Sequence, residues 1–200
     1  MSLLLPFMVS RGAPIYSTIF HGQLSSAFDF SQDASGGTVK NTWRSVIKPP
    51  GGFSKGGTKL RFVISADLTG WANDVGTAID HIGVGIWSGS GANTNATPVP
   101  VTTGGLAYWH TQAPFIALQS DEISLPFLAS DGLVVVIDTA SNPRSGLAGG
   151  SPGSNPGCSV WYKQNAASYN LATVGGYTQL PPAVPSMPWG LLGVLNIGAK

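Results

Sequence analysis

The fold class follows from the stretch Lys59-Leu60-Arg61-Phe62-Val63-Ile64-Ser65, in which polar and apolar side chains alternate. Successive side chains of a β-strand point to opposite faces of the sheet, so this period of two is typical of a half-buried strand. Leu60, Phe62 and Ile64 are therefore expected to point one way, into a core.

Strand signals of this kind recur along the chain, with Gly, Pro, Ser and Asn between them. Besides 59–65, strands are expected at 42–47, 78–87, 97–102, 121–127, 132–138, 159–163 and 189–197. Within 78–87 the core side is expected to be Ile82, Val84 and Ile86. The run Leu133-Val134-Val135-Val136-Ile137 is continuously apolar, which predicts a central strand covered on both faces.

Helix signals are almost absent, because no window of a dozen residues combines the three-and-four apolar spacing with caps and without Gly or Pro. Many short strands with turn residues between them are typical of a sandwich or jelly roll. The sequence therefore predicts an all-β fold, an antiparallel β-sandwich that is jelly-roll-like. The Gly-rich segment 51–57 is expected to be a hairpin turn, and 88–94 and 141–157 are expected to be loops.

We expect the chain to divide into an extended N-terminal arm over residues 1–37 and a β-sandwich domain over 38–200. The arm begins with apolar residues that we expect to pack on another subunit: Leu3, Leu4, Leu5, Phe7 and Met8. A signal peptide would carry its basic residue before the apolar stretch, whereas Arg11 follows it. No apolar run reaches the roughly 20 residues of a membrane helix, so no membrane span is expected.

Charge is scarce and unevenly distributed. Charged residues make up 10% of the chain, against about 25% in an average soluble protein. Residues 1–61 carry seven basic and two acidic side chains, 62–143 carry seven acidic and no basic ones, and 144–200 carry three basic and no acidic ones. The pattern indicates either a solvated surface without further meaning or complementary faces that meet on neighbouring copies. The basic residues are too sparse to predict binding of nucleic acid.

Catalytic templates fail one by one. The segment Ser88-Gly89-Ser90-Gly91 lacks the spacing and context of a nucleophile elbow. The single glutamate, Glu122, adjoins Asp121, and adjacent strand residues point to opposite faces, so the pair cannot readily flank one glycosidic bond. Cys158 is the one cysteine, so no internal disulfide forms. We therefore expect no enzyme activity, no catalytic residue and no cofactor.

Metal sites are not predicted either. The three histidines are far apart in the sequence and form no ligand motif, although zinc bound by Asp80 and His81 with distant help stays open. A calcium site also stays open at a loop whose oxygen ligands match no known spacing, namely Asp67, Asn73, Asp74 and Asp80.

Aromatic residues are the remaining signal for binding. Trp71 stands in a turn, and Tyr108-Trp109-His110 is a second cluster that we expect to be exposed. Exposed Trp and Tyr suit sugar stacking or a protein interface, since they supply a large contact area at low entropic cost. The alternative is core packing, which we expect for the other tryptophans: Trp43, Trp87, Trp161 and Trp189.

The order of several weak motifs over about residues 38–198 resembles a module of bacteriophage and prophage structural proteins. The module's elements in this chain are Thr42-Trp43-Arg44, Lys59-Leu60-Arg61-Phe62, Ile82-Gly83, Thr97-Pro98-Val99, Ser120-Asp121, Leu133-Val134-Val135-Val136-Ile137-Asp138, Tyr162-Lys163 and Gly176-Tyr177-Thr178. The 141–157 segment departs from the module's usual short connection.

This resemblance implies a non-enzymatic structural protein of a virion, either a head-surface decoration or a tail or fibre component. Its partners would be other virion proteins and further copies of itself, in a homo-oligomer within the assembly. The alternative is a carbohydrate-binding module for receptor attachment, which would take a host-surface glycan at Trp71, Tyr108, Trp109 and His110.

Overall fold

The structure is a computed structural model that describes residues 17–21, 26–29, 42–65, 78–79, 81–107, 109–110, 117–138, 146–149, 157–163, 176–179 and 191–196. Within these ranges all regular secondary structure is β-strand, and all strand pairs are antiparallel. The all-β prediction is confirmed. Among the same residues, no helix has the length and apolar character needed to cross a membrane.

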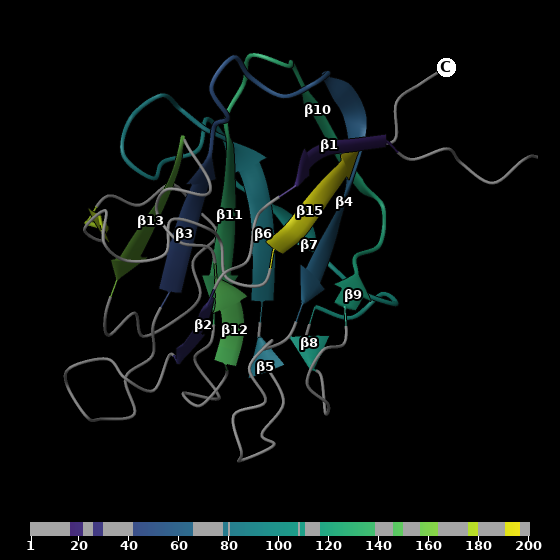
Figure 1. Cartoon of the computed structure of the whole chain (residues 1–200), viewed down its shortest axis with the longest axis vertical. Coiled ribbons are helices and arrows are strands. Elements are labelled where there is room, and N and C mark those ends of the chain that lie inside the picture. Colours follow the sequence, from purple (N-terminus) through teal and green to yellow (C-terminus); the bar gives the residue numbers. More distant parts are fainter. Residues whose placement is uncertain are drawn as a thin grey trace, which may run out of the picture.

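The larger sheet has six strands in the order β14-β13-β3-β11-β6-β7. Their bounds are Thr42–Ile47 (β3), His81–Ile86 (β6), Val99–Val101 (β7), Leu133–Asp138 (β11), Cys158–Lys163 (β13) and Thr178–Gln179 (β14). Figure 1 shows β13, β3, β11 and β6 side by side at the left and centre of the view. The apolar run of β11 is therefore central, with β3 on one side and β6 on the other.

The second sheet has five strands in the order β1-β15-β4-β10, with β9 also paired to β4. Their bounds are Ser17–His21 (β1), Gly57–Ser65 (β4), Ala117–Gln119 (β9), Ile123–Phe127 (β10) and Leu191–Asn196 (β15). The described residues also form two small sheets, one of Ser26–Asp29 (β2) with Gly146–Gly149 (β12), the other of Ala78–Ile79 (β5) with Trp109–His110 (β8).

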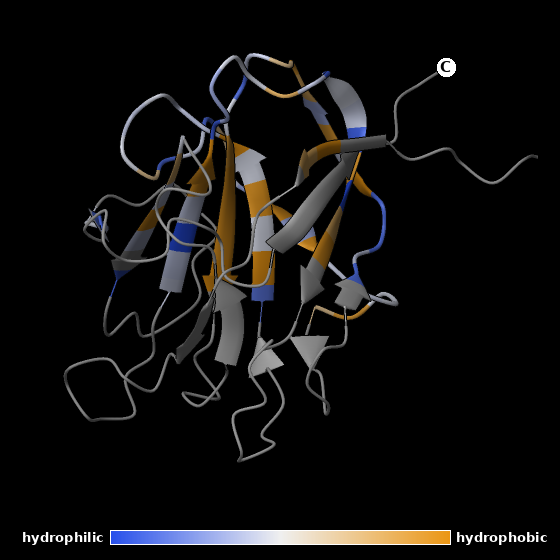
Figure 2. Ribbon diagram, in the orientation of Figure 1, coloured by the Kyte–Doolittle hydropathy of each residue, from blue (hydrophilic) through white to orange (hydrophobic). Residues whose placement is uncertain are grey.

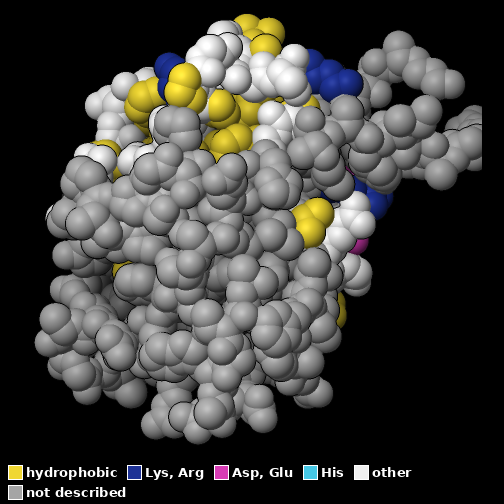
Figure 3. Space-filling model, viewed as in Figure 1, with side chains coloured by type: hydrophobic (Ala, Val, Ile, Leu, Met, Phe, Trp, Pro, Cys, Tyr) yellow, Lys and Arg dark blue, Asp and Glu magenta, His cyan; other side chains and the backbone are white. Residues whose placement is uncertain are grey.

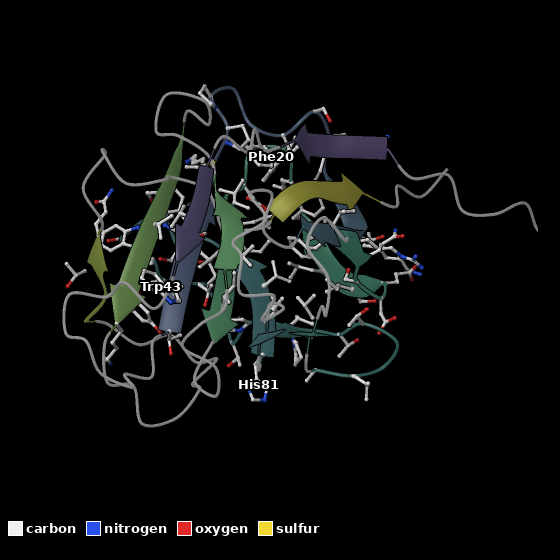
Figure 4. The ribbon with its side chains drawn as sticks, turned by 60° about the horizontal axis from the view of Figure 1, so that its bottom comes forward. Phe20, Trp43 and His81 are labelled. Atoms are coloured by element: carbon white, nitrogen blue, oxygen red, sulfur yellow. The ribbon has the colours of Figure 1, made fainter. Side chains whose placement is uncertain are left out.

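The main core lies between the two large sheets. Leu60 and Phe62 of β4 and Ile82 and Val84 of β6 are buried in one cluster, which confirms the predicted orientation of these four side chains. Ile86 is partly buried and packs against the same cluster, and the side chain of Ile64 lies outside the described part. In Figure 2, β6 alternates between orange and pale bands for this reason. Phe20 of β1 points toward this core (Figure 4) and packs against it.

The six-stranded sheet is also covered on its other side, which we call the outer face. Val46, Val134 and Val136 form a second buried cluster there, joined by Ala92. Because Val134 and Val136 alternate with the inward-facing residues of β11, this strand is apolar along its length and is orange throughout its coloured part in Figure 2. The prediction of a central strand covered on both faces is confirmed.

The segment 51–57 is not a hairpin turn, contrary to the prediction. It connects β3 in the six-stranded sheet to β4 in the five-stranded sheet. The backbone of this segment is bound to the turn after β10, since the amide of Phe53 donates to the carbonyl of Ala129 over 2.8 Å. The residues Pro49, Pro50, Gly51 and Gly52 therefore lie where the chain crosses from one sheet to the other. Local turn signals of this kind are the same for such a crossing and for a hairpin.

Two other segments differ from the expected outline. The 141–157 segment, expected to be a loop, contains β12, whose residues pair with β2. Two strands, β1 and β2, lie within the segment 1–37, and they pair with β15 and β12. The apolar residues proposed for the assembly arm, Leu3 to Met8, lie outside the described residues.

One side of the sandwich is formed by β7 and β10, which contact each other across the two sheets. The amide of Asp121 donates to the carbonyl of Thr102 over 2.8 Å, which ties the two sheets together beside these strands. Each strand carries an exposed proline, Pro100 in β7 and Pro126 in β10.

Candidate functional site

Arg44 is a charged residue placed at the centre of the outer face. Its neighbours across β3 are Val136 of β11 and Trp161 of β13. The side chain is completely buried, at 0% exposure, and its Nη1 donates to the carbonyl oxygen of Ala92 over 3.0 Å. A buried guanidinium needs such fixed partners, because leaving water is costly for a charged group.

The loop at 88–94 supplies that carbonyl, because it folds back over the outer face. Trp87 Nε1 donates to the carbonyl of Gly91 over 2.8 Å, and the Ser88 amide donates to the carbonyl of Asn93 over 3.0 Å. Thr94 packs over β6, where a Cβ on Gly85 would lie 2.8 Å from the Thr94 methyl carbon. The predicted loop therefore covers the outer face in a defined conformation. The absence of a side chain at Gly85 leaves the space that Thr94 occupies.

Four residues form what we call the aromatic-cation cluster: Arg44, Trp161, Lys163 and Tyr177. The guanidinium carbon of Arg44 lies 4.5 Å from the centre of the Tyr177 ring, and Lys163 Nζ lies 6.0 Å from the same centre. Both distances are within the range of cation–π attraction. Trp161, Lys163 and Tyr177 are partly exposed, so the cluster reaches the surface at the β13–β14 edge.

A second cation lies over an aromatic ring at the other end of the outer face. Lys48 Nζ is 4.8 Å from the centre of the Trp87 ring. Leu128, 67% exposed, lies at the same end of the sandwich, in the turn between β10 and β11. Figure 3 shows hydrophobic and Lys or Arg side chains together at the top of the view, where these connections lie in Figure 1.

Each carboxylate whose side chain the structure describes is bound to groups of the chain itself. Glu122 forms an ion pair with Lys59, and Asp131 accepts a hydrogen bond of 2.7 Å from the amide of Leu128. Asp121 accepts from the hydroxyl of Thr102 and from two glycine amides. The Lys59–Glu122 pair joins the basic first part of the sequence to the acidic middle part within one chain, so these two charges are not reserved for a neighbouring copy.

Asp121 holds the turn after β7 through hydrogen bonds to its charged form. Its Oδ2 accepts from Thr102 Oγ1 at 2.7 Å and from the Gly105 amide at 2.8 Å, and these bonds lower the pKa of the carboxyl. Because its pKa is lowered in the folded state, Asp121 stabilises the fold above the unfolded pKa of about 3.9, and this contribution is lost as the pH falls through the folded value.

We expect Asp121→Asn to unfold at a lower temperature than the unmodified chain at pH 7. The gap between the two melting temperatures should shrink below about pH 4 and close once Asp121 is protonated in the folded chain. Thermal unfolding followed by circular dichroism between pH 7 and acid measures it. A gap that stays constant down to about pH 2 would contradict this role of the charge.

Cys158 begins β13 and packs against the main core. Burial raises the pKa of its thiol to about 12, which disfavours the thiolate that acts as nucleophile.

We expect iodoacetamide at pH 8 to alkylate Cys158 on the order of a thousandfold more slowly in the folded chain than in guanidinium. Mass spectrometry of timed samples measures both rates, and equal rates would show that the thiol is accessible as thiolate in the native fold.

The residues predicted to bind a glycan are only partly placed. Trp109 and His110 form β8, where they pair with Ile79 and Ala78 of β5. Trp71 and Tyr108 lie outside the described residues, as do Asp67, Asn73, Asp74 and Asp80 of the possible metal sites. His81 is exposed at the start of β6 and points away from the sandwich in Figure 4. Among the described residues, no group of three His, Cys, Asp or Glu side chains is placed to hold a metal.

The tryptophans expected to fill the core divide between two places. Trp43 is buried between the sheets, at 6% exposure, whereas Trp87 and Trp161 pack partly exposed on the outer face. Trp189 lies outside the described residues. Sequence reasoning did not identify the aromatic-cation cluster, because Arg44 and Tyr177 are far apart in the sequence and neither lies in a local binding motif.

Comparison with known proteins adds no family to this geometry. A scan against models of protein families found no match to the chain. A search of curated proteins found no match either. Its function is therefore inferred from its own residues and their arrangement.

Proposed function

We propose that the chain is a non-enzymatic structural protein of a bacteriophage particle, on the head surface or in the tail. It acts there through surface contacts with other virion proteins and with copies of itself. Its sandwich corresponds in this proposal to the jelly-roll-like module that the order of motifs resembles.

The observation that carries the proposal is the meeting of three motif residues in one cluster. Arg44 comes from the Thr-Trp-Arg element, Lys163 from the Tyr-Lys element and Tyr177 from the Gly-Tyr-Thr element. They lie on β3, at the end of β13 and just before β14, and both cations lie over the same ring. A set of weak motifs that share one cluster supports a common fold more strongly than their order alone.

The described side chains also favour a role without catalysis. Asp121, Glu122 and Asp131 bind structural partners, and the pKa of Cys158 is raised away from reactivity. Among the residues whose side chains the structure describes, these three carboxylates hold turns and strands.

The test is mass spectrometry of particles purified on a density gradient from cells that carry the gene. We expect the chain in the particle band at a constant ratio to the major capsid protein, and its loss when the gene is deleted. Adding purified chain to the deletion particles should restore it to the band. Its absence from particles, together with a purified chain that stays monomeric and does not bind the deletion particles, would refute the proposal.

A second function is attachment of the particle to a host-surface glycan. The partly exposed rings of Trp161 and Tyr177 favour it, because aromatic rings next to polar groups suit the faces of sugars. Both functions are compatible in one virion protein.

A further inference from the structure

We propose that the aromatic-cation cluster at the β13–β14 edge binds an acidic polysaccharide. Lys163 meets a carboxylate of the polysaccharide, and the rings of Trp161 and Tyr177 meet its sugar rings. This inference rests on the glycan-attachment function proposed above and gives it a ligand class and residues.

The rings are held in place before any ligand arrives. Trp161 Nε1 donates to Ser159 Oγ over 3.0 Å, which fixes the indole. Tyr177 rests on the guanidinium of Arg44, which is itself held by the carbonyl of Ala92. Side chains that are already ordered lose little conformational entropy on binding, so a site of this kind favours affinity.

The cluster reaches the surface at the edge of the sheet, where Trp161, Lys163 and Tyr177 are partly exposed. Gln179 is exposed and lies directly across from Trp161 in the pairing of β14 with β13. Lys163 ends β13 on the same face, because it is two residues from Trp161 along the strand. An amide, an ammonium group and two rings thus share one edge, which combines apolar contact with the few polar groups that fix a ligand's orientation.

Charge selects an acidic sugar over a neutral one. Two cations, Arg44 and Lys163, lie at the Tyr177 ring. The carboxylates with described side chains bind elsewhere: Asp121 at the turn after β7, Glu122 at Lys59 of β4, and Asp131 at the turn before β11. A carboxylate of the ligand would form a charge-assisted contact with Lys163, which is stronger than a neutral hydrogen bond.

The experiment measures retention of the purified full chain by affinity electrophoresis in gels that contain polygalacturonate, alginate, hyaluronate or polysialate. Methyl-esterified polygalacturonate is the matched neutral gel. We expect retention by at least one acidic polymer and none by the ester. Lys163→Gln should weaken binding about tenfold, the effect of one charge-assisted contact. Lys55→Gln removes the same charge from the exposed β3–β4 connection and should change binding less than about twofold.

Gln179→Glu provides a second variant, because Gln179 is exposed and its replacement leaves the packing of the sheet intact. We expect the added negative charge to weaken binding as well. Retention by none of the four acidic gels, equal retention by the ester, or equal losses in Lys163→Gln and Lys55→Gln would each overturn the inference. A chain found in particles but retained by no gel would overturn this inference alone and leave the virion proposal standing.

Discussion

Replacing Gly157 with alanine is expected to lower the free energy of unfolding by about 3 kcal/mol. Gly157 has a φ of +81°, in the left-handed region, and a Cβ there would overlap the carbonyl oxygen of Lys48. The amide of Lys48 also donates a hydrogen bond to the carbonyl of Gly157 over 3.2 Å. The two chain segments therefore cannot move apart to accommodate a Cβ without losing this hydrogen bond. Urea unfolding monitored by tryptophan fluorescence measures the change.

Gly51 supplies the matched control for this prediction. Its φ of +79° is nearly the same, but a Cβ there would meet nothing within 4 Å. Gly51→Ala should therefore cost only the left-handed conformation, about 1–2 kcal/mol. Equal losses in the two variants would show that the close approach of Gly157 to Lys48 has no energetic consequence.

Replacing Arg44 with alanine is expected to destabilise the chain by about 3 kcal/mol. The change removes a completely buried side chain from beneath the Tyr177 ring and so leaves a cavity there. It also removes the hydrogen-bond donor from the carbonyl of Ala92, a buried residue. For a chain of this length the melting temperature should fall by about 6–12 °C. Differential scanning calorimetry gives both the enthalpy and the midpoint.

Arg44→Met separates the two contributions, because methionine fills much of the space but donates no hydrogen bond. We expect it to recover a good part of the loss, since an apolar side chain of similar volume often replaces a buried charge at little cost. An Arg44→Met variant as unstable as Arg44→Ala would indicate that the hydrogen bond to Ala92, and not packing, dominates. An Arg44→Ala variant as stable as the unmodified chain would contradict the role of Arg44 altogether.

The strands could be predicted because their signal is local. The alternation at 59–65 and the apolar run at 133–137 correspond to β4 and β11, and their buried faces follow from the period of two. The assignment of strands to sheets could not be predicted in this way. Pro49, Pro50, Gly51 and Gly52 signal a change of direction equally for a hairpin and for a crossing between sheets. What decides between them is the distant turn at Ala129, to which Phe53 is bound.

The candidate site was beyond local reasoning for a similar reason. The outward position of Arg44 follows from the alternation in β3, but its burial depends on Ala92 and Tyr177, which other strands bring to it. Turn-like sequence predicts exposed aromatic residues at Trp71 and Trp109, whereas Trp161 and Tyr177 lie in or beside strands at the edge of a sheet. Edge position is a property of the strand order, which local sequence does not encode.

The prolines of β7 and β10 bear on whether a strand of another molecule can add to this side of the sandwich. Pro100 and Pro126 remove one backbone donor each from strands on the same side of the sandwich. A strand from another molecule that tried to extend either sheet there would meet a gap in the ladder of hydrogen bonds. Edge-to-edge pairing of strands between molecules is therefore disfavoured along this side. A high local concentration of the chain is then less prone to produce fibrils by strand addition at β7 or β10.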